Sequence, residues 1–157
     1  MREAFHDELD GIFADLSDIC GQVEVAVREA TKALMTGDVH VAKIARLRVP
    51  SVAVPEELRP TMERMAETAE DMVRRVRGII VDRDVEAAIE LGRDDEIMDQ
   101  LRRRSFTELL STDWQHGVEA AVDIALLGRY YERIADHSVS VANRVVFVVT
   151  GEQPQRD

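Results

Sequence analysis

Apolar residues recur every three or four positions through most of this 157-residue chain. That spacing places side chains on one face of an α-helix, whereas a half-buried β-strand would alternate every two residues. Four prolines and eight glycines leave long stretches without a helix breaker. The sequence therefore predicts an all-α protein. The first row, in residues 4–36, consists of Phe5, Leu9, Ile12, Phe13, Leu16, Ile19, Cys20, Val23, Val27, Ala30 and Leu34.

Three further helices are predicted after a short segment at 39–49 and a proline-bounded linker at 50–55. Pro55 suits the first position of a helix, because its fixed φ is helical and an N–H there would lack a helical partner. The expected helices run from Pro55 to about Val81, from Val85 (capped by Asp84) to about Leu110, and from Trp114 to about Thr150. Short turns join them, which predicts an up-down-up three-helix bundle over residues 56–150 and a disordered tail at 151–157.

The charge balance limits the classes of partner. Twenty basic and thirty-one acidic residues give a net charge of −11, which argues against nucleic-acid binding and favours cations or basic partners. The single cysteine, Cys20, excludes an intrachain disulfide, and its place in an apolar row suits a small buried side chain. No signal peptide and no stretch of eighteen apolar residues is present, so we expect a cytoplasmic protein without membrane insertion.

Two pairs of acids have helical spacing. Glu132 and Asp136 share one face of the last predicted helix, and Asp95 and Asp99 share a face of the helix before it. Anions one turn apart repel each other unless a cation lies between them. If the two helices pack side by side, the four carboxylates converge and form an oxygen-rich metal site. The alternative is a structural role, in which the acids form ion pairs with arginines such as Arg129.

Other patterns are weaker. The runs Arg102-Arg103-Arg104 and Arg74-Arg75-Val76-Arg77 could bind phosphate, but basic runs on helices are more often solvated faces. A metal-dependent hydrolase or di-iron oxidase is a further alternative. A di-iron site of the ferritin type would need a Glu-x-x-His pair on each of two helices, and the sequence contains neither two such pairs nor a nucleophile motif. We therefore predict no enzyme activity and no catalytic residues.

The stretch from Leu127 to His137, LGRYYERIADH, resembles the R-Y-x-E-R-x-x-D-H motif of the PhoU family of phosphate-transport regulators. The stretch RDDEIMD at residues 93–99 and the long N-terminal helix support the resemblance. Members of that family consist of two three-helix repeats, each with a pair of carboxylate motifs that can hold metal. The resemblance implies that Asp95, Asp99, Glu132 and Asp136 are the second repeat's motif and bind a divalent or trivalent ion such as Fe, Zn, Mn or Mg.

This chain departs from the family pattern in its first part. Residues 1–49 resemble an incomplete first repeat that lacks most of its second and third helices and both of its acidic motifs. The long first helix would then expose apolar side chains unless it packs on the remaining bundle or on another subunit, so we expect a homo-oligomer or a disordered missing piece. The resemblance further implies a negative regulator of phosphate-starvation signalling. Its partners would be the phosphate ABC-transporter ATPase and a sensor histidine kinase.

Overall fold

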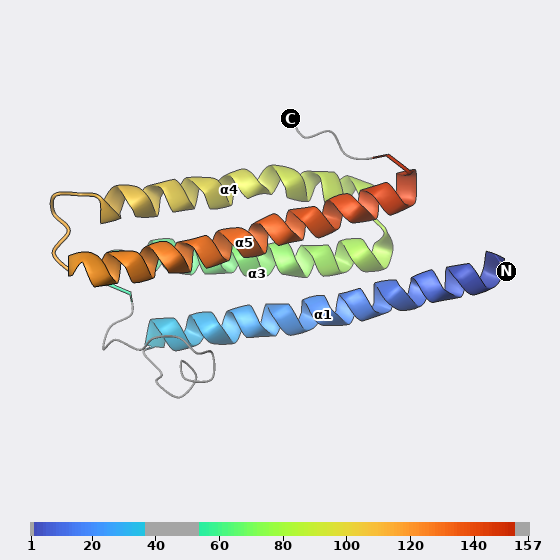
Figure 1. Ribbon diagram of the computed structural model, residues 1–157, viewed down its shortest axis with the longest axis horizontal. Helices are drawn as coiled ribbons and strands as arrows, with labels where there is room; N and C mark the ends of the chain where they lie inside the picture. The colour runs from blue at the N-terminus through green and yellow to red at the C-terminus, as the bar shows by residue number, and fades with distance from the viewer. Residues whose placement is uncertain (1, 37–53, 153–157) are drawn as a thin grey trace.

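The computed structural model describes residues 2–36 and 54–152. These ranges contain four α-helices, α1 (Arg2–Thr36), α3 (Arg59–Asp82), α4 (Val85–Leu109) and α5 (Gly117–Thr150), and no β-strand. Helices α3, α4 and α5 pack side by side, and α1 lies along α3 with its N-terminal end projecting beyond the bundle (Figure 1). The predicted all-α class and three-helix bundle with an added N-terminal helix are confirmed.

Helix α3 is the centre of the molecule, because it packs against each of the other three helices. Its inward face is rich in methionine, whose flexible side chain fills irregular gaps between helices. Alanines on α3, α4 and α5 are buried as well and allow the helix backbones to approach closely. The fully buried large side chains include Leu58, Met62, Met65, Met72, Ile80, Leu91, Met98 and Ile124.

The turn between α3 and α4 forms as the sequence predicts. Arg83 takes a left-handed conformation, with φ of 53°, and ends α3. Asp84 then caps α4, because its side chain accepts a hydrogen bond of 3.0 Å from the backbone N–H of Ala87. This tight reversal directs α4 back along α3 and fixes the register of the acidic residues on α4.

Two helix starts differ from the prediction. Helix α3 begins at Arg59, and the Pro55 carbonyl instead accepts hydrogen bonds of 3.1 Å from the N–H groups of Leu58 and Arg59 in a preceding turn. Pro60 lies in the first turn of α3, where its missing N–H costs nothing. Helix α5 begins at Gly117, whose φ of +80° is not helical and therefore separates the helix from Trp114.

Parts of the predicted organisation lie outside the described residues. These are the segment 39–49, most of the linker at 50–55 and residues 153–157 of the tail. Val54 and Pro55, the last two positions of the linker, are buried against the bundle. Within the two ranges that the structure covers, no helix has both the length and the apolar composition that crossing a bilayer requires.

Candidate acidic site on α4 and α5

The two predicted acid pairs lie on neighbouring helices. Helix α4 contributes Asp95 and Asp99, and the adjoining α5 contributes Glu132 and Asp136. Glu132 is buried, Asp95 is half-buried, and Asp136 is exposed. Burial raises the pKa of Asp95 above its ordinary value, and the negative charges of Asp136, Asp99 and Glu132 raise it further. The other three carboxylates are therefore close enough to Asp95 to disfavour its charged form.

Two arginines compensate the charge of Glu132. Arg102 Nη1 donates a hydrogen bond of 2.6 Å to Glu132 Oε1, across the interface between α4 and α5. Arg129 Nη1, one turn earlier on α5, lies 2.6 Å from Glu132 Oε2. The second contact has the distance of an ion pair but not the angles of a hydrogen bond, so Oε2 has no hydrogen-bond partner among the described residues. Paired guanidinium groups offset the cost of burying this carboxylate.

Weaker ion pairs extend the cluster toward solvent. Arg129 Nη1 also lies 3.9 Å from Asp136 Oδ2, and Arg103 Nη2 lies 3.7 Å from Asp99 Oδ2. All four of these side chains are exposed by about half or more, so each pair contributes little to stability. The outer part of the cluster thus retains carboxylate oxygens that water or a cation can reach.

The pairing of Glu132 with Arg129 is one of the alternatives that the sequence raised, whereas the role of Arg102 was missed. Asp95, Asp99 and Arg102 follow one another at spacings of four and three residues on α4. That spacing puts the arginine on the same helix face as the two acids. The signal is present in the sequence, but the arginine run by itself indicates only a solvated face or a phosphate site. Arg102 also stacks over Phe106, at 5.6 Å from the ring centroid, which helps to orient it.

Two residues on α5 set the position of the helix at this site. Gly128 is buried where α5 crosses α3 and α4, and a Cβ atom there would lie 3.7 Å from Met65 Cε and 3.9 Å from Ser105 Oγ. Tyr131 is buried as well, and its hydroxyl shares a hydrogen bond of 2.8 Å with the hydroxyl of Thr31 on α1. These contacts hold the α5 backbone beside α4, and they give α1 a link to α5.

The chemistry of the cluster suits a hard cation only after rearrangement. Carboxylate oxygens are the ligands that Mg²⁺ and Mn²⁺ prefer, and zinc and iron accept them too. In the described part of the chain, however, no three Asp, Glu, His or Cys side chains are placed to hold one ion together. Arg102 and Arg129 already supply positive charge at Glu132. As they are placed here, the residues do not form a ready metal site, and guanidinium groups would have to move before an ion could bind.

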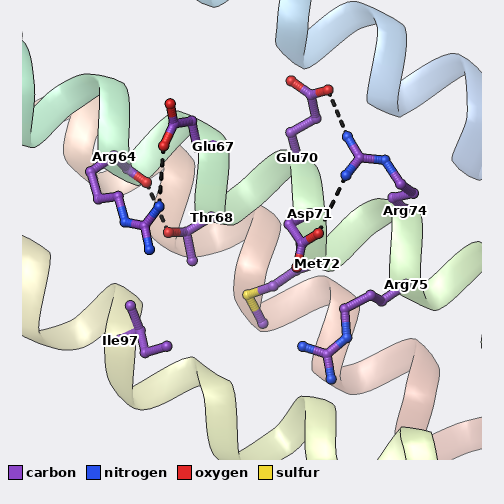
Figure 2. A pocket seen from close by; sticks show the side chains of 9 residues that line it. All are labelled: Arg64, Glu67, Thr68, Glu70, Asp71, Met72, Arg74, Arg75 and Ile97. Carbon is purple, nitrogen blue, oxygen red and sulfur yellow. Dashed lines mark hydrogen bonds and ion pairs between the residues drawn. The ribbon is translucent and has the colours of Figure 1, made fainter.

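The arginine run on α3 is part of a charge network with carboxylates. A shallow hollow of about 420 Å³ on α3, bordered by Ile97 of α4, contains Arg64 and Arg74 together with several acids (Figure 2). Arg74 forms ion pairs of 3.1 Å with Glu24, 2.9 Å with Glu70 and 3.3 Å with Asp71. Because these acids compensate its charge, the hollow does not have the character of a phosphate site.

This geometry defines a class of protein. Its members are all-α bundles with acid pairs at helical spacing on two adjoining helices. Residues 62–145, which contain most of α3, all of α4 and most of α5, match the model of the PhoU domain. All four acids and both arginines lie in the matched region. The chain belongs to the PhoU family.

Individual relatives agree with this assignment. The chain is 31% identical over 216 positions to the phosphate-specific transport system accessory protein PhoU homolog 1 of Mycobacterium leprae, covering 100% of this chain and 97% of the relative. It is 31% identical over 213 positions to the corresponding homolog 2 of Mycobacterium tuberculosis, covering 98% and 100%. With homolog 1 of M. tuberculosis it shares 43% identity over 119 residues, which are 76% of this chain and 54% of the relative. No solved structure matches the chain.

The long alignments also bear on the length of the chain. The match to the M. leprae protein extends over 216 positions, whereas this chain has 157 residues, so the relative has a stretch without a counterpart here. That difference is consistent with the predicted incomplete first repeat. Its assignment to residues 1–49 stays a prediction.

Proposed function

We propose that this protein is a regulatory adaptor that couples phosphate transport to phosphate-starvation signalling in the cytoplasm, without enzyme activity. One observation carries the proposal: the PhoU domain matches residues 62–145, and the long alignments are to proteins named as accessory proteins of phosphate-specific transport. In this role the protein represses the starvation response while phosphate is plentiful. Its partners are the ATPase of the phosphate ABC transporter and the cytoplasmic part of a sensor histidine kinase.

The charge of the chain supports binding to basic protein surfaces. Its net charge is −11, and exposed acids on α3, α4 and α5 contribute to a negative surface. Complementary charge between partners raises association rates and disfavours partners of the wrong sign. We expect binding to the ATPase and the kinase to weaken as the salt concentration rises.

We further propose that Asp95, Asp99, Glu132 and Asp136 bind a metal ion, such as Fe, Zn, Mn or Mg, when Arg102 and Arg129 move away from Glu132. The support is electrostatic. Burial is the main cause of the raised pKa of Asp95, and the negative charges of Asp136, Asp99 and Glu132 add to it. A multivalent cation would offset those negative charges, and it would free two guanidinium groups that could then contact a partner.

A second candidate function is a purely structural interaction module. The observation that favours it is the engagement of Glu132 by Arg102 and Arg129, each at 2.6 Å. In this alternative the acids and arginines only hold α4 and α5 together, and no ion binds. The two candidates share the fold and differ in whether the acidic cluster takes up metal.

The adaptor function is tested by measuring binding of the purified full chain to the transporter ATPase and to the kinase cytoplasmic domain by biolayer interferometry. An ATPase subunit from an importer of another substrate is the control. We expect micromolar or tighter binding to at least one of the two proposed partners, weakened by salt, and no binding to the control. Absence of binding to both, or equal binding to the control, would contradict the proposal.

A further inference from the structure

The outer face of α5 is open to solvent. Helix α5 packs against α3 and α4 with the side that contains Ile124, Gly128 and Ala135. The side that points away from both helices carries an apolar residue at every fourth position of its first half. These residues are Val118, Val122, Leu126 and Tyr130, which are 81%, 51%, 50% and 55% exposed. The first half of α5 therefore presents an apolar row that no described helix covers.

The row continues with basic residues in the second half of α5. Arg133 and His137 follow Tyr130 at spacings of three and four residues, and Arg144 follows two turns later. All three basic side chains are exposed, and none has an ion pair or a hydrogen bond within residues 2–36 and 54–152. Arg102, by contrast, contacts a carboxylate at 2.6 Å. The positive charge of Arg133 and Arg144 is therefore available to a partner.

The acids around this face do not cancel its positive half. Glu119 and Asp123 border the apolar half, one to three turns before Arg133. Asp136 lies on the side of the row toward α4, where Arg129 Nη1 is 3.9 Å from its Oδ2 atom. The outer face thus has an apolar half and a positive half, although the whole chain has a net charge of −11.

The spacing of the basic residues fits an extended anionic partner. At a rise of about 1.5 Å per residue, Arg133 and His137 lie about 6 Å apart along the helix axis, and Arg144 lies about 10 Å further on. A single phosphate would need donors that converge on its oxygens. The net charge of −11 argues against nucleic acid. An amphipathic helix with carboxylates along part of one face has the length, the apolar surface and the charge that remain.

We propose that the outer face of α5, over residues 122–144, docks an acidic amphipathic helix of a partner protein. Apolar side chains of that helix pack on Leu126 and Tyr130, and its carboxylates pair with Arg133 and Arg144. Partner helices commonly bind through an apolar face at this spacing, and tyrosine and arginine often dominate the binding energy of interfaces. This inference does not depend on the proposed regulatory function or on metal binding.

The proposal assigns a role to residues of the sequence motif that the acidic cluster leaves unused. In the stretch LGRYYERIADH, residues 127–137, Glu132 and Asp136 belong to the cluster beside α4. Tyr130, Arg133 and His137 of the same stretch are exposed on the outer face. Because exposed side chains contribute little to the stability of the fold, packing alone does not account for these three.

The test uses a synthetic, fluorescently labelled peptide of about 24 residues, long enough to form a helix. One half of its contact face has leucines at spacings of three and four, the other half has glutamates at those positions, and alanine and glutamine fill the rest. A peptide of the same composition in scrambled order is the control. We expect fluorescence anisotropy to show that the full chain binds the ordered peptide at least tenfold more tightly than the scrambled one.

Variants of the full chain locate the binding face. Arg133→Glu should weaken binding of the ordered peptide about tenfold, because it places an acid against the peptide's glutamates, whereas Arg133→Lys should keep it. Leu126→Ala should also weaken binding about tenfold, through the apolar area that is lost. Arg93→Glu and Ile97→Ala, at exposed positions of α4, are the matched controls and should change little. Circular dichroism should show equal helical content throughout.

Equal affinity for the ordered and scrambled peptides would overturn the proposal, and so would equal effects of Arg133→Glu and Arg93→Glu. Two other occupants of the face give different results. Self-association of the wild type that Leu126→Ala abolishes, measured by sedimentation equilibrium, would assign the face to a second copy. Binding to vesicles of phosphatidylcholine and phosphatidylglycerol that Arg133→Glu abolishes, without binding of the peptide, would assign it to a lipid surface. Either result would contradict a helical protein partner.

Discussion

Glu132 is the most buried carboxylate of the acidic cluster, and its environment explains the chemistry of the residues around it. Arg102 and Arg129 each approach one of its oxygens to 2.6 Å, and breaking such a pair leaves a buried charge without compensation. Within residues 2–36 and 54–152, Asp95 has no ion pair of this kind, and its charge is opposed by burial and by three neighbouring acids. The charge of Glu132 is therefore well compensated, whereas Asp95 is destabilised in its charged form.

The raised pKa of Asp95 predicts a stabilising substitution. The folded state binds the Asp95 proton more tightly than the unfolded chain does, so ionised Asp95 lowers the stability of the metal-free protein above its raised pKa. That cost disappears as the pH falls toward 3.8, the ordinary value. Asp95→Asn should therefore raise the free energy of unfolding at pH 7 by less than about 1 kcal/mol, because solvent screens a half-buried group.

Urea denaturation at several pH values, with chelator present, measures the effect of Asp95→Asn. The advantage over wild type should shrink steadily as the pH is lowered through the acidic range. Glu63→Gln, an exposed acid on α3, is the control and should change stability little. A variant that is less stable than wild type at pH 7 would show that Asp95 makes a favourable interaction in the metal-free fold.

Local sequence signals predicted some helix boundaries better than others. Asp84 marked the start of α4 correctly, because an N-cap acts through its own side chain and the nearby backbone. The starts of α3 and α5 were placed too early. Pro55 suited the first position of a helix, but α3 begins at Arg59 with Pro60 in its first turn. The +80° φ of Gly117 was not visible from the spacing of apolar residues.

The packing of α5 against α3 and α4 predicts the effect of substitutions at Gly128. A Cβ atom at this position would make ordinary contacts, the nearest at 3.7 Å from the flexible end of Met65. Gly128→Ala should therefore gain helix propensity without a clash and stabilise the protein by about 0.5–1 kcal/mol. Gly128→Leu should destabilise it by about 1–3 kcal/mol, because a long side chain overfills the crossing.

Thermal unfolding measures both changes, with Gly78→Ala as the matched control. Gly78 is exposed on α3, and a Cβ atom there has no neighbour within 4 Å, so alanine should stabilise it through propensity alone. Similar rises in melting temperature for Gly128→Ala and Gly78→Ala are expected. A fall for Gly128→Ala would show that α5 approaches its neighbours more closely than the structure indicates.

At the scale of the whole molecule, the spacing of apolar residues predicted the all-α bundle. A helix with one buried face has an apolar residue every three or four positions, and that spacing is visible in the sequence. The convergence of the acids depended on which helices are neighbours, and short turns between α3, α4 and α5 made that predictable as well. The partners of Glu132 were harder to predict. Arg102 and Arg129 are two among many arginines, and only the packed geometry selects them.

We propose the acidic cluster of α4 and α5 as the functional centre of the protein, and metal content tests that proposal most directly. The purified chain is incubated with Mn²⁺, Zn²⁺ or Fe²⁺ and desalted. The metal bound per chain is then measured by elemental mass spectrometry. Asp99→Ala with Asp136→Ala removes two acids of the cluster. Glu63→Ala with Glu67→Ala also removes two acids, both exposed on α3, and serves as the control.

We predict at least one bound ion per chain in the wild type and in the control, and almost none in the Asp99→Ala, Asp136→Ala variant. Circular dichroism should show the same helical content in all three proteins. Equal metal content in the wild type and in the Asp99→Ala, Asp136→Ala variant would contradict the account, and would leave the acids as ion-pair partners of Arg102 and Arg129.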